Sequence, residues 1–96
     1  MFTISIKIQG ITQEFTLNGK DFKCITTEDE NEANKYFNRE KNTLLEYCNI
    51  DYKGQVTLCK TEYSSGIIKT SYFDYIRFSL TPELIQILEQ SQIIND

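Results

Sequence analysis

The chain has 96 residues, 40% of them hydrophobic and 25% charged, with 10 basic against 14 acidic side chains and no histidine. This length predicts a single globular domain over residues 1–96, and the composition is typical of a folded rather than a disordered chain. The lack of histidine excludes Ser-His and Cys-His catalysis, histidine metal sites and histidine pH switches. No apolar run approaches the ~18 residues needed to cross a bilayer, and no signal peptide opens the chain. We therefore expect a cytoplasmic protein that does not associate with a membrane.

The first strand is expected at residues 2–9, where apolar and polar residues alternate. Its apolar residues all fall on one side, as in a half-buried antiparallel strand: Phe2, Ile4, Ile6 and Ile8. A second strand follows Gly10, with Ile11, Phe15 and Leu17 as its apolar residues. A third strand carries Phe22 and Cys24 on one face.

Asn18-Gly19 separates the second and third strands and is a strong hairpin signal. Both central residues of a type I′ turn need positive φ, which Asn and Gly tolerate best. The first 26 residues therefore predict a three-stranded meander.

A helix is expected over residues 28–48. Thr27 and Glu30 are spaced like the two residues of a capping box. Apolar residues then recur at helical spacing, ending at Cys48. Glu40 and Lys41 lie on this stripe, which leaves open a kink or break near residues 38–43, or a Lys41 stem that covers the stripe.

The second half predicts two strands and a helix. Residues 55–63 alternate, Ser64-Ser65-Gly66 has hairpin length, and residues 67–80 are rich in β-branched and aromatic residues. Thr81-Pro82-Glu83 is typical of a helix start, with an N-cap hydroxyl followed by Pro at the first helical position. The apolar side of this helix is expected to consist of Leu84, Ile85, Ile87 and Leu88.

The predicted order is βββ-α-ββ-α. An α+β fold follows, in two layers, with two helices on one face of a mainly antiparallel sheet.

The cysteines are three, an odd number, and none forms a CxxC pair. A zinc site therefore has no sequence support, and we expect no metal. Cys24, Cys48 and Cys59 are interpreted as reduced, buried packing residues.

The run from Glu28 to Glu32 contains four acids: Glu28, Asp29, Glu30 and Glu32. Carboxylates are favourable at a helix start, where they meet the positive end of the helix dipole. A docking surface for a basic partner is the functional alternative. Calcium binding is not expected, because the ligand pattern of an EF-hand is absent.

The strand at 67–80 carries large residues on both faces. We expect Ile76 and Phe78 to point inward, which leaves the other face exposed with Lys69, Phe73, Tyr75 and Arg77. Aromatic residues and Arg dominate protein-binding hot spots, and they also stack single-stranded bases. A partner-binding surface is therefore predicted here, unless a loop or a homodimer partner covers it.

No glycine-rich phosphate loop or catalytic motif occurs, so we expect neither an enzyme nor a cofactor. The favoured function is a small protein-binding module that occupies a partner protein's surface, as inhibitors, immunity factors and anti-defence proteins do. Its assignment to a phage or bacterium rests on small size and richness in Ile, Asn and Lys. The alternatives are a single-stranded nucleic-acid or nucleotide binder, less expected for a chain of net charge −4, and a homo-oligomeric structural subunit.

Overall fold

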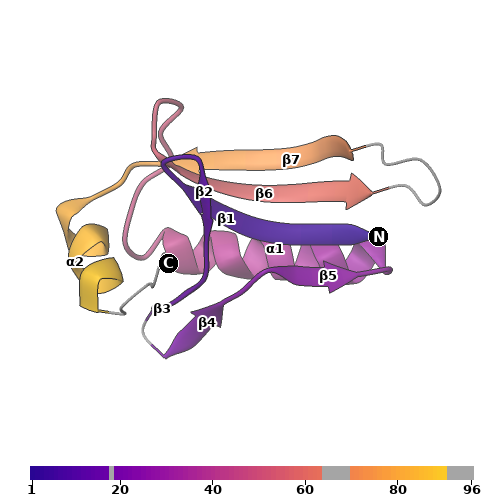
Figure 1. The fold of residues 1–96 in the computed structure, drawn as a ribbon, viewed down its shortest axis with the longest axis horizontal. Coiled ribbons are helices and arrows are strands. Elements are labelled where there is room, and N and C mark those ends of the chain that lie inside the picture. Colours follow the sequence, from indigo (N-terminus) through magenta and orange to yellow (C-terminus); the bar gives the residue numbers. More distant parts are fainter. Residues whose placement is uncertain (18, 64–69, 91–96) are drawn as a thin grey trace.

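A computed structural model of the chain describes residues 1–17, 19–63 and 70–90, without the side chains of residues 70–73, 87 and 90. It shows an α+β fold with a mainly antiparallel sheet and two helices, α1 (Glu30–Leu44) and α2 (Pro82–Gln90), as the sequence predicts. Figure 1 shows α1 lying along one face of the sheet and α2 beyond one end of it. Neither of these described helices is long and apolar enough to span a membrane.

The centre of the sheet is formed by β1 (Phe2–Ile8) and β6 (Val56–Tyr63), which pair antiparallel along the whole length of β1. β7 (Thr70–Phe78) pairs with the other side of β6 and is the outermost strand. Two short strands share the remaining edge of β1: β2 (Ile11–Gln13) pairs with its second half and β5 (Ile25–Thr27) with its first half. β7 therefore ends the sheet on one side (Figure 1).

The core lies between the sheet and the helices. The alternation predicted for β1 is confirmed, since its four even-numbered apolar residues are all buried. Val56, Leu58 and Phe78 continue this buried face across β6 and β7, and Phe37 and Leu44 of α1 pack on it. Lys60 also points to this side, where its Nζ donates a hydrogen bond to Asn34 of α1.

The predicted three-stranded meander is wrong. β3 (Phe15–Leu17) and β4 (Lys20–Phe22) form a separate two-stranded hairpin, and only β2 and β5 on either side of it join β1. The chain parts from the sheet at Glu14, whose carboxylate accepts the N–H of Cys24 at 2.9 Å. The hairpin can then turn inward and bury its apolar residues: Phe15, Leu17 and Phe22.

The turn of this hairpin agrees with the sequence prediction. Leu17 pairs directly with Lys20, which leaves a two-residue connection, and Gly19 has a φ of +77°. Residue 18 lies outside the described residues. The rings of Phe15 and Phe22 stack across the hairpin with centroids 5.1 Å apart, and β3 contacts α2.

The predicted start and end of the first helix are wrong by a few residues. Asp29, not Thr27, is the N-cap, and its side chain accepts the N–H of Asn31 at 2.9 Å. Thr27 instead accepts the N–H of Asp29 at 3.1 Å, so the Thr hydroxyl shapes the approach to the helix rather than its first turn. α1 then runs without a break through residues 38–43 and ends at Leu44 rather than at Cys48.

The second helix begins as predicted. The Thr81 hydroxyl accepts the N–H of Leu84 at 3.2 Å and donates to the carbonyl of Tyr47 at 3.0 Å, which ties the helix start to the turn that follows α1. Leu84 is fully buried, but Ile85 is 39% exposed, so the expected apolar side is only partly turned to the core. Residues 64–69, which include the predicted loop, lie outside the described residues.

Candidate functional site

The sheet face turned away from α1 carries no helix within the described part of the chain (Figure 1). We call it the open face. Alternation along the three long strands brings to it Lys7 and small side chains of β1 and β6, and larger side chains of β7. The residues concerned are Thr3, Ser5, Lys7, Thr57, Cys59, Thr61, Tyr75 and Arg77.

Tyr75 and Arg77 project from β7 onto the open face. They lie opposite Cys59 and Thr57 in the β6–β7 register, and Tyr75 is 62% exposed. Ile76 is half-buried and Phe78 is fully buried on the α1 side. The orientation predicted for these four residues is confirmed.

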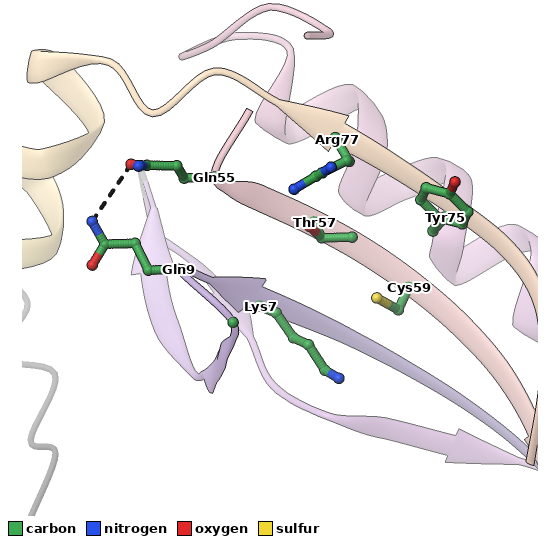
Figure 2. Close-up of a pocket in the computed structure, with 8 residues that line it drawn as sticks. Lys7, Gln9, Gln55, Thr57, Cys59, Tyr75 and Arg77 are labelled. Atoms are coloured by element: carbon green, nitrogen blue, oxygen red, sulfur yellow. Dashed lines mark hydrogen bonds between the residues drawn. The ribbon is translucent and has the colours of Figure 1, made fainter. Parts of the chain in front are cut away.

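A hollow of about 460 Å³ lies on the open face, and we call it the face hollow. Figure 2 shows that Lys7 comes from β1, Thr57 and Cys59 from β6, and Tyr75 and Arg77 from β7. One end is closed by Gln9, whose amide donates to Gln55 at 3.5 Å, and by Gly10. The lining contains two cationic side chains and no acidic one, so the hollow suits an anionic or polar group.

A second hollow lies along the outer edge of β7, and we call it the edge hollow. Its lining consists of Ile50, Tyr52, Tyr75, Ile76 and Arg77. Successive strand residues point to opposite faces, so a hollow that touches residues 75, 76 and 77 must lie beside the strand edge itself. Tyr75 and Arg77 therefore separate the face hollow from the edge hollow.

Ile50 and Tyr52 are held at this edge by the segment that precedes β6. The N–H of Asp51 donates to the carbonyl of Arg77 and the N–H of Ser79 to the carbonyl of Asn49, both at 2.8 Å. Arg77 in turn donates from Nη1 to the carbonyl of Tyr52 at 3.2 Å. Ile50 and Tyr52 remain 54% and 89% exposed.

Ile50 and Tyr52 were not predicted from the sequence as part of this surface. The available signal was the Asp51-Tyr52-Lys53-Gly54 turn, in which a large aromatic residue stands where turns favour small polar ones.

The other two predicted binding residues of the long strand are not placed by the structure. Lys69 and the side chain of Phe73 lie outside the described residues. The β6–β7 register shifts between Lys60 and Thr61, which pair with Asp74 and Tyr72. Phe73 therefore has no direct partner in β6, and the simple alternation used to assign its face does not hold across this bulge.

The acidic cluster lies apart from Tyr75 and Arg77. Asp29 is the N-cap of α1, and Glu30 and Glu32 occupy its first turn, in the helical layer. Glu28 is 85% exposed and pairs with the amino group of Met1 at 3.8 Å. The structure thus gives this cluster a structural role at the helix start and does not join it to the open face.

All three cysteines are free. Cys48 and Cys59 are buried as predicted, but Cys24 is exposed, because it lies where the chain returns from the β3–β4 hairpin to the sheet. Burial raises the pKa of Cys48 to about 11 and also raises that of Cys59, where Lys7 only partly opposes it. At the more exposed Cys24, partial burial and the negative charges of Glu14 and Glu40 raise the pKa. None of these thiols has the lowered pKa of a reactive nucleophile.

No group of three or more potential metal-binding side chains gathers among the described residues. Comparisons with protein-family models, curated proteins and solved structures returned no match. The geometry brings together exposed aromatic rings, an arginine and two adjoining hollows at one edge of the sheet.

Proposed function

We propose that this protein is a small, non-enzymatic protein-binding module that works by occupying the surface of a partner protein, as an inhibitor or immunity-type protein does. The observation that carries the proposal is the position of Tyr75 and Arg77. Both are exposed on a sheet strand, between two hollows, with Tyr52 and Ile50 exposed beside them. A few hot-spot residues supply most of the binding energy in protein interfaces; they are enriched in Tyr, Trp and Arg and cluster in pockets.

The strand scaffold supports the same proposal. Arg77 donates to Tyr52 and its own carbonyl accepts from Asp51, so the exposed residues of this surface are already positioned. Preorganised side chains lose less conformational entropy when they bind.

Free thiols support a reducing compartment, and we propose a cytosolic protein.

The test is a comparison of three immobilised proteins as bait in a lysate of the encoding organism. The wild type is expected to capture a partner that the double variant Tyr75→Ala/Arg77→Ala does not. The variant Glu28→Lys/Glu30→Lys, changed on the other layer, serves as the matched control and is expected to capture the same partner. Equal capture by wild type and double variant would remove the basis of the proposal.

A single-stranded nucleic acid is the second candidate ligand. It is favoured by one observation, an exposed tyrosine beside Arg77 on a face that also holds Lys7, since bases stack on aromatic rings and phosphates attract cations. Fluorescence anisotropy with a labelled 12-nucleotide DNA or RNA at low and high salt distinguishes the two. Tight, salt-sensitive binding that is lost in the Tyr75→Ala/Arg77→Ala variant would favour nucleic acid over protein.

A further inference from the structure

The outer edge of β7 is only partly occupied. Ile50 forms a bridge opposite Phe78, and Asp51 donates to the carbonyl of Arg77. After Asp51 the chain turns away, because Lys53 and Gly54 donate back to the Asp51 side chain and carbonyl at 3.0 and 2.8 Å. Among the described residues, no backbone hydrogen bond reaches the outer edge from Thr70 to Tyr75.

The backbone groups of Tyr75 point to this edge. The N–H and C=O of a strand residue lie on the same side, and the side alternates from residue to residue. Since the carbonyl of Arg77 points outward to Asp51, both polar groups of Tyr75 also point outward. An exposed strand edge of this kind is a template for another strand.

The edge hollow lies where such a strand would lie. It is lined by three consecutive residues of β7 together with Ile50 and Tyr52, so an added strand would place a side chain into it. The lining is mainly apolar and aromatic, which suits an apolar side chain. Arg77 is the only charged group of the lining and forms no ion pair within the described part of the chain, so it suits a carboxylate on the same added strand.

From these observations we infer that the partner docks by β-strand addition: an extended segment of another protein, with an acidic residue beside an apolar one, pairs with β7 at Tyr75. This inference rests on the proposed function and specifies its binding mode. The acidic residue of the segment exchanges two backbone hydrogen bonds with Tyr75, and its carboxylate contacts Arg77. The apolar residue next to it in the segment enters the edge hollow. Main-chain bonds supply affinity and the alternating side chains supply specificity.

The experiment uses random twelve-residue peptides displayed on phage and selected against the immobilised full chain. Selected peptides are expected to contain an acidic residue near an apolar one and to slow hydrogen exchange of the Tyr75 amide at least tenfold. Methylation of the peptide's amide nitrogens, one at a time, is expected to weaken binding at least tenfold at the residue facing Tyr75 and to leave the residues on either side of it tolerant. This readout needs no variant of the protein to fold.

The outcomes separate the binding mode from the surface. Peptides that lose affinity for the Tyr75→Ala/Arg77→Ala variant, but tolerate methylation everywhere and leave the Tyr75 amide unprotected, would overturn strand addition and keep the docking surface. Peptides that bind the wild type and this variant equally would overturn both. A selection that yields no peptide, or a free protein that is dimeric in gel filtration with its Tyr75 amide already protected, would also overturn the inference, the latter by making a second copy the occupant.

Discussion

Glu40 of α1 is buried, at 2% exposure, and neither of its carboxylate oxygens has a hydrogen-bond partner among the described residues. Its neighbour Arg39 lies over the ring of Tyr36, 4.9 Å from the centroid, rather than in an ion pair with it. Glu40 lines a pocket of about 420 Å³ together with Lys20 and Asp21 of the β3–β4 hairpin. Burial raises the pKa of Glu40 to about 7, and the charge of Arg39 only partly opposes it.

The raised pKa of Glu40 predicts that its contribution makes the folded protein less stable as the pH rises. A carboxyl whose pKa is higher in the folded than in the unfolded chain costs nothing below the unfolded pKa of about 4.5, and its cost grows until pH passes the folded value of about 7. Between pH 5 and 8 the wild type should lose roughly 2–3 kcal/mol of unfolding free energy relative to Glu40→Gln, at about 1.4 kcal/mol per pKa unit. Urea titrations of both proteins across this range measure the difference, and parallel curves would contradict it.

The three thiols predict a graded reactivity. Cys24 is exposed, whereas Cys48 and Cys59 are buried, and Cys48 also donates to the carbonyl of Leu44. Titration with a thiol reagent, without reductant, should find one accessible thiol in the native protein and three after denaturation. Fewer than three in denaturant would indicate a disulfide, and three rapid reactions in the native protein would place Cys48 and Cys59 at the surface.

At the scale of elements, the turn before β6 packs closely against the backbone at the end of β7. A Cβ added to Gly54 would lie 1.9 Å from the carbonyl oxygen of Phe78, whereas one added to Gly10 meets nothing within 4 Å. Gly54→Ala must therefore shift the backbone and should cost more than about 3 kcal/mol, and Gly10→Ala only the ~1–2 kcal/mol of its positive φ. Thermal midpoints that fall equally in both variants would show that the turn adapts freely.

The strand β1 allows a matched comparison of the two sheet faces. Ile4 and Ile6 point to α1 and are buried, while Ser5 between them is half-buried on the open face. Ile4→Ala or Ile6→Ala should cost roughly 2–5 kcal/mol, and Ser5→Ala less than about 1 kcal/mol. Chemical denaturation measures all three, and a destabilisation by Ser5→Ala as large as that by Ile4→Ala would mean that the open face is part of a core.

The sequence best predicts those helices, strands and turns whose formation depends on neighbouring residues alone. The alternation of β1, the Asn18-Gly19 turn and the Thr81-Pro82 helix start each need only a few neighbouring residues. The prediction fails where distant partners decide the structure. β5, which follows the β3–β4 hairpin, pairs with β1, and the carboxylate of Glu14 accepts the N–H of Cys24 across the base of the hairpin. The surface follows the same rule, since alternation predicts Tyr75 and Arg77, but Tyr52 joins them only through tertiary hydrogen bonds.

For the whole molecule, the charge is divided between the layers. Net charge is −4, with acids at the start of α1, whereas the face hollow contains Lys7 and Arg77 and no acid. Charges outside a contact surface act mainly on the rate of association. Glu28→Lys/Glu30→Lys should therefore change the association rate constant and its salt dependence, with the dissociation rate constant unchanged in surface plasmon resonance; a large rise in dissociation would place the acidic cluster inside the interface.

The measurement that bears most directly on the docking surface is partner affinity of the Tyr75→Ala/Arg77→Ala variant, with thermal unfolding of the same sample. Both side chains are exposed in the free protein, so its stability should change by only about 1 kcal/mol. Calorimetric affinity should fall at least tenfold, since ~1.4 kcal/mol already corresponds to that factor. A variant that unfolds, or one that stays folded and binds as tightly as the wild type, would contradict the assignment of Tyr75 and Arg77 to the docking surface.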